Sequence, residues 1–411
     1  MIRGRNRLYG SVRIESAKNA VLPMMAASVL TKEKVVIENC PKISDVLSLI
    51  EILGRLGVKT EFYNENLIVD SGEITGDKIP EYLMKELRSS IFVVGALLSR
   101  TGSAEFSLPG GCNLGERPID FHINGLKTLG YSVADDGEII KVSGKATGST
   151  VKLPFASVGA TENIILASVT AKGATEIINA AREPEIVDLI GMLNSMGAKI
   201  SGAGTGRLSI EGVERLYGTR YKPMSDRIET GTYLIAAVMT GGKVRITNAD
   251  TENISFITDK FCNNTCKVDR INGIITINSD GKVRPFDFST GPFPAFPTDM
   301  QPQSVAMLSL AGGISRVKET VFKNRFGYVE SLNKMGAAIK VEGDTATCYG
   351  VRRLHGETVW AGDLRGGAGI CLAALAAEGD SHVYGVEHID RGYYAFEGKL
   401  KSLGADIERI Y

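Results

Sequence analysis

Hydrophobic and polar positions along the chain repeat one plan about every 70 residues. Each copy starts with an apolar helix of small residues and continues through a strand, a turn and an amphipathic helix. A Leu-Gly or Met-Gly step ends that helix, and a strand of alternating polarity follows, as in residues 58–62. Glycine after the last apolar helical residue is the expected left-handed helix stop. These glycines are Gly57, Gly130, Gly197, Gly336 and Gly404.

The spacing of these glycines predicts six copies, because the interval between Gly197 and Gly336 is about twice the others. Units of this length exceed the common solenoid repeats, and 411 residues exceed one ordinary core. We therefore expect an α/β protein of two domains with three copies in each. The apolar helices carry few charges, as in residues 164–171, so they should be buried with the sheets outside them.

Composition places the chain among globular proteins and excludes several partners. Hydrophobic residues make up 43% and charged residues 23%, and 47 basic residues balance 47 acidic ones. A general nucleic-acid or membrane-surface binder would carry a basic excess, so neither partner is expected. No apolar run reaches the ~20 residues of a spanning helix, and the basic start of the chain lacks the apolar core of a signal peptide. Six scattered cysteines fit free thiols in a reducing compartment, so a cytoplasmic location is expected.

A lysine stands directly before the first apolar helix, in the segment Ser16-Ala-Lys-Asn-Ala20. At a helix start, Lys18 would add a point charge to free backbone N–H groups, and together they can hold an anion. The alternative is a solvated lysine beside a helix cap.

Three glycines surround one cysteine in the segment from Pro109 to His122. A thiol in such a glycine-rich loop is open to solvent and substrate. A nearby Arg117 or Lys18 would favour its reactive thiolate form. An inert cysteine in a turn is the alternative, but the glycines and the Arg-Pro-Ile-Asp sequence that follows favour a functional Cys112.

An acidic residue follows two prolines in the segment Pro294-Ala-Phe-Pro-Thr-Asp-Met-Gln301. The prolines stiffen the approach, and Asp299 stands where a helix is expected to begin. Asp299 is therefore either a helix cap or, if that cap faces a domain cleft, a general base.

Four arginines stand at element ends in equivalent parts of the copies, at Arg88, Arg325, Arg365 and Arg391. Each one alone is an ordinary surface charge. Together with Lys18 and Arg117 they would form a ring of cations, suited to a substrate that carries a carboxylate and several phosphates.

Metal and nucleotide motifs do not stand out in the sequence. Cys262 and Cys266 lie four residues apart but lack a second ligand pair, and no Walker loop or dinucleotide fingerprint has its strand context. The histidines also lack metal-ligand spacing; they are His122, His355, His382 and His388. We therefore expect neither a metal nor a cofactor.

Several longer segments resemble the EPSP synthase-like enolpyruvyl transferase family over essentially the full chain, and within it the branch that acts on UDP-N-acetylglucosamine. The segments are Ala17-Lys-Asn-Ala20, Pro109-Gly-Gly-Cys112 with Arg117-Pro118, Ser157-Val-Gly-Ala-Thr161, Ala181-Arg-Glu-Pro-Glu-Ile-Val-Asp188, Asp226-Arg-Ile-Glu-Thr-Gly231, Phe296-Pro-Thr-Asp-Met-Gln301, Asn324-Arg-Phe326 and His388-Ile-Asp-Arg-Gly-Tyr393.

The resemblance implies a two-domain inside-out α/β barrel with three repeats of a βαβαββ-type unit in each domain. One domain would span residues 19–226 and carry the Cys112 loop. The other would comprise residues 1–18 and 227–411 and carry Asp299, Arg325, Arg365 and Arg391. The active site would be the cleft between them, which closes on substrate.

The resemblance also implies roles for single residues. Cys112 would protonate the methylene of phosphoenolpyruvate or take part in product release, and Asp299 would be the general base near the sugar 3'-hydroxyl. Lys18 and Arg391 would assist catalysis. The phosphoenolpyruvate contacts would be Lys18, Asn19, Arg117, Arg325 and Arg391. The UDP-sugar contacts would be Asn19, Arg88, Arg117, Pro118, Ile119, Asp120, Phe121, Ser157, Val158, Gly159, Asp299 and Val321. Asp363 and Arg365 would support the closed cleft.

The implied reaction transfers the enolpyruvyl group of phosphoenolpyruvate to UDP-N-acetylglucosamine and releases phosphate, as the first committed step of peptidoglycan synthesis. It needs an acid, a base and fixed cations, but no metal or redox cofactor. Fosfomycin-type thiol alkylators would inhibit it at Cys112. The alternatives are a weakly active regulatory paralogue, a transferase acting on shikimate 3-phosphate and, more distantly, a cysteine hydrolase.

Overall fold

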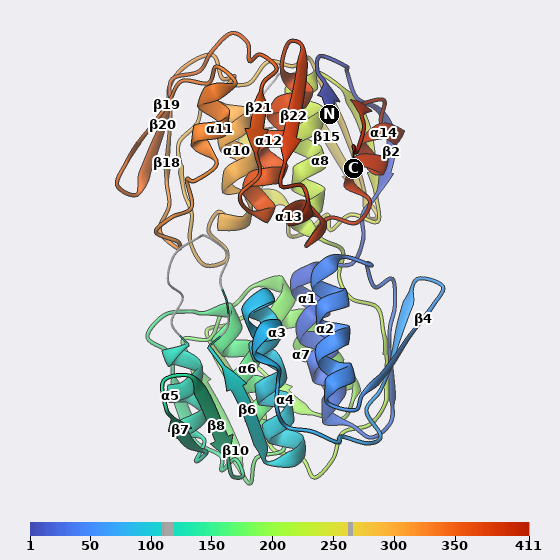
Figure 1. The fold of residues 1–411 in the computed structure, drawn as a ribbon, viewed down its shortest axis with the longest axis vertical. Coiled ribbons are helices and arrows are strands. Elements are labelled where there is room, and N and C mark those ends of the chain that lie inside the picture. The colour runs from blue at the N-terminus through green and yellow to red at the C-terminus, as the bar shows by residue number, and fades with distance from the viewer. Residues whose placement is uncertain (109, 111–118, 262–265, 411) are drawn as a thin grey trace. The chain divides into compact units, whose positions relative to one another are not determined.

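The computed structural model describes residues 1–108, 110, 119–261 and 266–410. The described residues form two compact units. The terminal unit contains residues 1–15 and those from 225 onward, and the central unit contains the described residues between 16 and 224. Both chain ends that Figure 1 marks belong to the terminal unit.

The central unit carries three sheets around a set of helices. Its sheets have the strand orders β13-β3-β5-β4, β6-β8-β7 and β11-β12-β10-β9. The helices are α1 (Lys18–Ala27), η1 (Ser28–Leu30), α2 (Ser44–Arg55), α3 (Glu81–Glu86), η2 (Arg88–Ser90), α4 (Ile91–Thr101), α5 (Asp120–Thr128), α6 (Val158–Ser168) and α7 (Pro184–Ser195). The strands are β3 (Lys34–Ile37), β4 (Lys59–Tyr63), β5 (Asn66–Asp70), β6 (Ser103–Ser107), β7 (Ser132–Asp135), β8 (Ile139–Ser143), β9 (Thr150–Lys152), β10 (Ala174–Ile178), β11 (Lys199–Ser201), β12 (Arg207–Glu211) and β13 (Thr219–Tyr221).

The terminal unit repeats this plan with the strand orders β15-β16-β14-β2, β17-β18-β20-β19 and β21-β22-β1-β23. Its helices are α8 (Arg227–Thr240), α9 (Ser255–Phe261), η3 (Thr298–Met300), α10 (Gln301–Leu308), α11 (Val329–Lys334), α12 (Leu364–Ala376), α13 (Glu387–Asp390) and α14 (Phe396–Ser402). Its strands are β1 (Ile2–Arg3), β2 (Tyr9–Arg13), β14 (Lys243–Thr247), β15 (Cys266–Ile271), β16 (Ile274–Ser279), β17 (Phe288–Ser289), β18 (Ser315–Lys318), β19 (Ile339–Glu342), β20 (Thr345–Cys348), β21 (Thr358–Trp360), β22 (Asp380–Tyr384) and β23 (Asp406–Ile407).

The innermost helices of each unit touch through small residues. An added Cβ on Gly95 of α4 would lie 2.4 Å from the backbone oxygen of Asn163 in α6, and one on Gly369 of α12 would lie 2.9 Å from that of Pro302 in α10. The strands outside these helices alternate between exposed and buried residues, as in β12, where every second residue is buried. The predicted α/β class, with buried helices inside and half-exposed sheets outside, is confirmed.

The five marker glycines have the left-handed backbone that the pattern predicts, with φ between 89° and 96°. Equivalent asparagines in two copies of the repeat also make the same hydrogen bonds, which the hydrophobic pattern did not predict. The Asn194 side chain accepts from the backbone N of Ile200 and donates to its oxygen, both at 2.9 Å. Asn333 makes the same pair of bonds to Ile339, at 3.0 and 2.9 Å.

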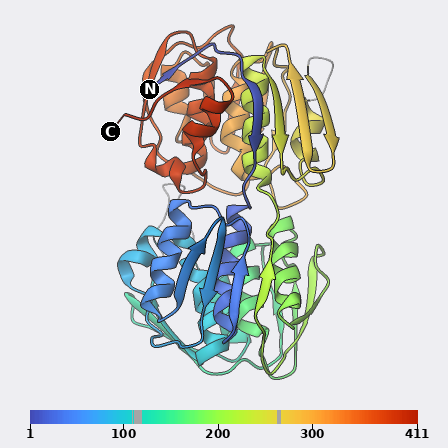
Figure 2. The same ribbon diagram turned by 90° about the vertical axis from the view of Figure 1, so that its right-hand side faces the viewer.

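Strands distant in sequence complete the sheets. β13 pairs in parallel with β3, with Thr219 opposite Val35, and β2 pairs in parallel with β14, with Tyr9 opposite Lys243. Figure 2 shows β2, in dark blue, beside the yellow strands of its sheet. The first residues of the chain are therefore an integral part of the terminal unit.

The chain passes from one unit to the other between residues 15 and 16 and again between residues 224 and 225. On each side of these boundaries, a backbone hydrogen bond joins the two passing segments. Ala17 donates to the oxygen of Met224 at 2.8 Å in the central unit, and Asp226 donates to the oxygen of Glu15 at 2.9 Å in the terminal unit. Lys18 is therefore grouped with Asn19 in the central unit.

None of the helices within the described residues has the length and apolar character needed to cross a membrane.

Candidate active site

The predicted site residues divide between the two units, and each group is described within its own unit. Lys18, Asn19 and Arg88 lie in the central unit, with the segments 119–121 and 157–159. The terminal unit holds Asp299, Val321, Arg325, Asp363, Arg365 and Arg391. Three predicted residues lie outside the described residues, namely Cys112, Arg117 and Pro118.

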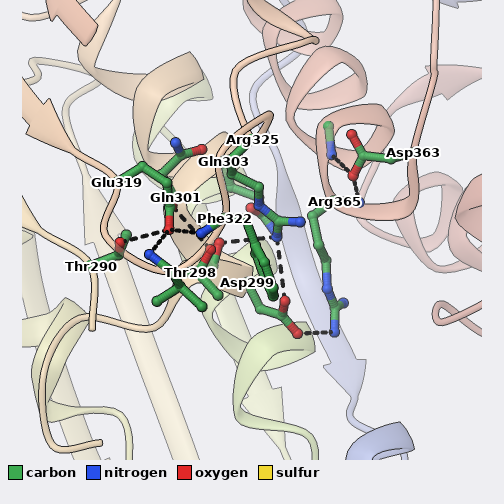
Figure 3. A network of polar contacts seen from close by, with 12 residues as sticks. Thr290, Thr298, Asp299, Gln301, Gln303, Glu319, Phe322, Arg325, Asp363 and Arg365 are labelled. Carbon is green, nitrogen blue, oxygen red and sulfur yellow. Dashed lines mark hydrogen bonds and ion pairs between the residues drawn. The ribbon is translucent and has the colours of Figure 1, made fainter. Parts of the chain in front are cut away.

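Asp299 lies between two buried arginines in the terminal unit (Figure 3). Nη2 of Arg325 is 3.3 Å from Oδ1 of Asp299, and Nη2 of Arg365 is 3.1 Å from Oδ2. The arginine side chains are only 2% and 3% exposed, whereas that of Asp299 is 28% exposed. The carboxylate is therefore fixed at both oxygens by charge-assisted hydrogen bonds and still reaches the surface of the unit.

Asp299 does not act as a helix cap. It lies within η3, and no side-chain cap bond starts either η3 or the following α10. The capping interpretation of this aspartate is therefore wrong, because its carboxylate is turned toward the guanidinium groups instead of toward the free N–H groups of the helix.

The cap expected of an aspartate is found one repeat later. Oδ1 of Asp363 accepts from the backbone N of Arg365 and of Gly366, both at 3.0 Å, and so begins α12. Arg365 then lies with its guanidinium 5.3 Å from the centre of the Tyr393 ring. Burial alone would lower the pKa of Arg365, but Asp299, Tyr393 and Asp226 together outweigh burial and raise this pKa above its usual value. Arg365 therefore remains a cation inside the unit.

Arg391 follows α13 in the same unit. Helix α13 packs closely on α12, because an added Cβ on Gly367 would lie 2.9 Å from the Ile389 side chain. The preceding Asp390 is held by two hydrogen bonds from Arg409, at 2.7 and 2.8 Å. These contacts fix the segment that carries Arg391.

Lys18 is the first residue of α1, and its Nζ lies 2.5 Å from Oδ2 of Asp45 on α2. The two side chains are 13% and 5% exposed. The alternative of a solvated lysine is therefore wrong. A cation held rigidly at a helix start is an arrangement that can bind an anion.

Residues of the predicted UDP-sugar set begin two helices of the central unit. Ile119 immediately precedes α5, and Asp120 and Phe121 are its first residues. The Ser157 hydroxyl accepts from the backbone N of Ala160 at 3.4 Å and caps α6, in which Val158 and Gly159 are the first two residues.

His122 lies between these two helix starts of the central unit, although the sequence suggested no role for it. Its side chain is buried on α5, and its Nδ1 lies 3.2 Å from the amide nitrogen of Asn163 on α6. An added Cβ on Gly159 would lie 3.5 Å from its Cε1. Burial, together with the charge of Arg88, lowers the pKa of His122 to about 3, so the ring is neutral near pH 7.

Among the residues that the structure describes, no group of three or more His, Cys, Asp or Glu side chains could hold a metal ion. The described residues offer four kinds of functional group: the partly exposed carboxylate of Asp299, the buried guanidinium groups beside it, the fixed ammonium group of Lys18 and the free N–H groups of helix starts. This combination fits acid–base chemistry on a polyanionic substrate.

Each unit has helices inside and sheets outside, and each holds fixed cationic side chains; these features define the class of protein. The family model of EPSP synthase (3-phosphoshikimate 1-carboxyvinyltransferase) matches residues 2–400. The chain belongs to this family.

The chain is also similar over its whole length to individual members of the family. The chain is 48% identical over 411 residues to "UDP-N-acetylglucosamine 1-carboxyvinyltransferase 2" of Caldanaerobacter subterraneus subsp. tengcongensis, covering all of this chain and 99% of that one. It is 44% identical over 414 residues to "UDP-N-acetylglucosamine 1-carboxyvinyltransferase" of Gluconacetobacter diazotrophicus, with coverage of 100% and 99%.

Solved structures share the fold. The enolpyruvyl transferase NikO from Streptomyces tendae has a TM-score of 0.89 at 26% identity, covering 99% of this chain and 97% of that one. An EPSP synthase from Acinetobacter baumannii has a TM-score of 0.76 at 16% identity, covering 100% and 99%, which is a likeness of fold alone.

Proposed function

We propose that the protein transfers the enolpyruvyl group of phosphoenolpyruvate to the 3'-hydroxyl of UDP-N-acetylglucosamine and releases phosphate. The observation that carries the proposal is identity of 44–48% over the whole chain to relatives named for this carboxyvinyl transfer. The carboxylate of Asp299 between two buried guanidinium groups supports it, because the reaction needs a base beside fixed cations.

In the proposed mechanism, a proton is added to C3 of phosphoenolpyruvate and leaves an oxocarbenium-like centre at C2. The sugar 3'-hydroxyl attacks C2 while Asp299 accepts the hydroxyl proton. A proton then leaves C3, the C2–C3 double bond forms again, and the C2–O bond to phosphate breaks. The products are the enolpyruvyl ether of the sugar nucleotide and phosphate. Cys112 supplies the acid at C3 or assists product release.

Asp299 is suited to the role of base by its exposure and its fixed position. Hydrogen bonds from Arg325 and Arg365 fix the rotation of the carboxylate. A carboxylate oxygen can accept more than one hydrogen bond, so the sugar hydroxyl can approach an oxygen that already accepts from an arginine. Holding the base still lowers the entropy that must be lost on reaching the transition state.

The remaining site residues would bind the two polyanionic substrates. Lys18, Asn19, Arg117, Arg325 and Arg391 would contact phosphoenolpyruvate. The UDP-sugar would be bound by Asn19, Arg88, Arg117, the segments 118–121 and 157–159, Asp299 and Val321. The helix starts at Asp120 and Val158 offer backbone N–H groups, which suits a diphosphate.

Because these residues come from both units, the proposal requires the two units to close around the substrates, with the site in the cleft between them. Asp363 and Arg365 would support that closed state. The reaction needs neither a metal nor a redox cofactor, nor a nucleic-acid or membrane partner. We further propose a cytoplasmic enzyme of peptidoglycan synthesis that fosfomycin-type alkylators inactivate at Cys112.

The test is phosphate release by the purified protein with phosphoenolpyruvate and UDP-N-acetylglucosamine together. Omitting the sugar nucleotide is the background control, and shikimate 3-phosphate as acceptor tests the sister reaction. Release that requires UDP-N-acetylglucosamine supports the proposal. Release only with shikimate 3-phosphate would overturn it, and sugar-nucleotide binding without turnover would favour a regulatory paralogue instead.

A further inference from the structure

A second carboxylate, which the proposed mechanism does not use, lies close to Asp299. Glu319 follows β18 and is only 4% exposed. Its Oε1 accepts from the Thr290 hydroxyl at 2.9 Å and from the backbone N of Val321 and of Phe322, at 2.8 and 3.1 Å. Its Oε2 accepts from the Thr298 hydroxyl at 3.0 Å. Figure 3 shows this carboxylate as the meeting point of these bonds.

All four of these donors are neutral, and within the described part of the chain no lysine or arginine forms an ion pair with Glu319. Burying a carboxylate is costly unless hydrogen bonds replace its water. Glu319 therefore acts as an acceptor that holds several separate segments together, at the cost of its own hydration.

These bonds lead to the proposed base by two routes. The first passes through Thr298, which immediately precedes Asp299 and whose backbone oxygen accepts from Nη2 of Arg325 at 3.0 Å. The same Nη2 atom donates to Asp299 at 3.3 Å. The second route passes through Phe322, whose ring centre lies 5.6 Å from the Arg325 guanidinium.

We infer that Glu319 is a positioning residue for Asp299. Its Oε2 fixes the Thr298 segment, and its Oε1 fixes the turn that carries Val321 and Phe322, so that Arg325 and Asp299 keep their relative positions. The inference rests on the function proposed above, in which Asp299 accepts a proton from the sugar hydroxyl. Glu319 touches neither substrate in this account and acts only through the residues it holds.

The sharpest test cuts the bond between Glu319 and Thr298 while the carboxylate stays in place. Thr298→Val removes the donor hydroxyl with little change of shape, and Thr298→Ser restores it. Thr320→Val is the matched control, because its hydroxyl donates to the backbone oxygen of Thr290 at 2.8 Å in the same turn without contacting Glu319. All three variants are compared with the wild type in kcat, in KM for each substrate and in melting temperature.

We expect Thr298→Val to lower kcat about tenfold or more, because small displacements of a reacting group are costly. Its KM for the sugar nucleotide should stay within about twofold of the wild type. Thr298→Ser and Thr320→Val should keep kcat within about threefold. An equal loss of kcat in Thr320→Val, or no loss in Thr298→Val, would overturn the inference.

Glu319→Gln and Glu319→Ala give a second comparison. The glutamine oxygen can still accept from the two backbone N–H groups while its amide nitrogen faces the Thr298 hydroxyl, so this variant should retain more turnover than the alanine variant. Equal kcat values in two folded variants would contradict the inference.

Turnover by the wild type tests the proposed function and does not test the role of Glu319. If the wild type does not turn over, the proposed function fails, and the crystal structure of Thr298→Val becomes the test. An Asp299 carboxylate displaced from Arg325 and Arg365 would support the positioning role, and unchanged distances would overturn it.

Discussion

Lys18 and Asp45 form a buried ion pair between the first two helices of the central unit, with Nζ of the lysine 2.5 Å from Oδ2 of the aspartate. Removing one member of such a pair leaves the other charge buried without its partner. The aspartate is thus as important for the position of Lys18 as the helix that carries it.

Asp45→Ala should lower the free energy of unfolding by about 3 kcal/mol, measured by urea denaturation. The matched control is Glu211→Ala, which breaks the Lys199–Glu211 pair. That pair is 2.7 Å apart but 60% and 65% exposed, so its loss should cost less than about 1 kcal/mol. The double variant Lys18→Met/Asp45→Leu should recover much of the loss. A similar cost for Asp45→Ala and Glu211→Ala would show that the buried pair has no special weight.

Asp363 sets the start of α12 and with it the position of Arg365. Asp363→Ala should destabilise the terminal unit by about 1 kcal/mol through loss of the cap, and should also lower kcat/KM. Asp363→Asn keeps an oxygen that can accept from the same two N–H groups, so it should stay close to the wild type in stability. Thermal unfolding and steady-state kinetics of the two variants check this, and equal stability of both would contradict the capping role.

The proposed mechanism requires an acidic group at position 112, and the proposed inhibition requires a thiol there. Cys112→Ser should reduce turnover at least a hundredfold, since a serine hydroxyl is a far weaker acid than a thiol. Cys112→Asp places an acid there that a thiol alkylator cannot modify, so it should retain activity and resist fosfomycin. Residual activity after incubation with the drug is the measurement. Full inactivation of the aspartate variant would rule out Cys112 as the site of alkylation.

The buried carboxyl group of Glu229 should make the free energy of unfolding depend on pH. Its side chain is buried in α8, where it accepts from Lys399 at 2.8 Å and from the backbone N of Glu15 at 2.9 Å. Burial raises the pKa of Glu229 from 4.5 to about 7, although Lys399 opposes the shift. Between these values the folded state binds more protons than the unfolded chain, so this group stabilises the fold less as pH rises from about 4.5 to 7.

Glu229→Gln removes this titration and should flatten the dependence. The difference in urea midpoint between variant and wild type should therefore change in favour of the variant between pH 5 and pH 7.5. A difference that is the same at both pH values would show that Glu229 does not titrate in this window.

The sequence pattern predicts the architecture well because the repeat enforces it. The glycine after each amphipathic helix needs a left-handed backbone, and an inner helix without charges can only be buried. The sequence analysis also named Asp299, Arg325 and Arg365 as candidate site residues, but it did not predict that both arginines contact this carboxylate. Arg325 and Arg365 contact this carboxylate from positions 26 and 66 residues further along the chain, and these contacts depend on how the repeats pack against one another.

The supporting residues were beyond the reach of pattern reasoning. Glu319 looks like any charged residue after a strand, and His122 looks like any lone histidine. Their importance comes from burial and from hydrogen bonds to other repeats, which depend on tertiary packing.

The pairing of β1 and β2 with strands near the end of the sequence affects how the protein folds during synthesis. β1 lies between β22 and β23, so its partners leave the ribosome only after some 380 residues have been made. The central unit can complete its core first, while the leading fifteen residues remain unpaired. A fragment starting at Ser225 would lack two strands and expose sheet edges, so it should aggregate unless a peptide of residues 1–15 is supplied.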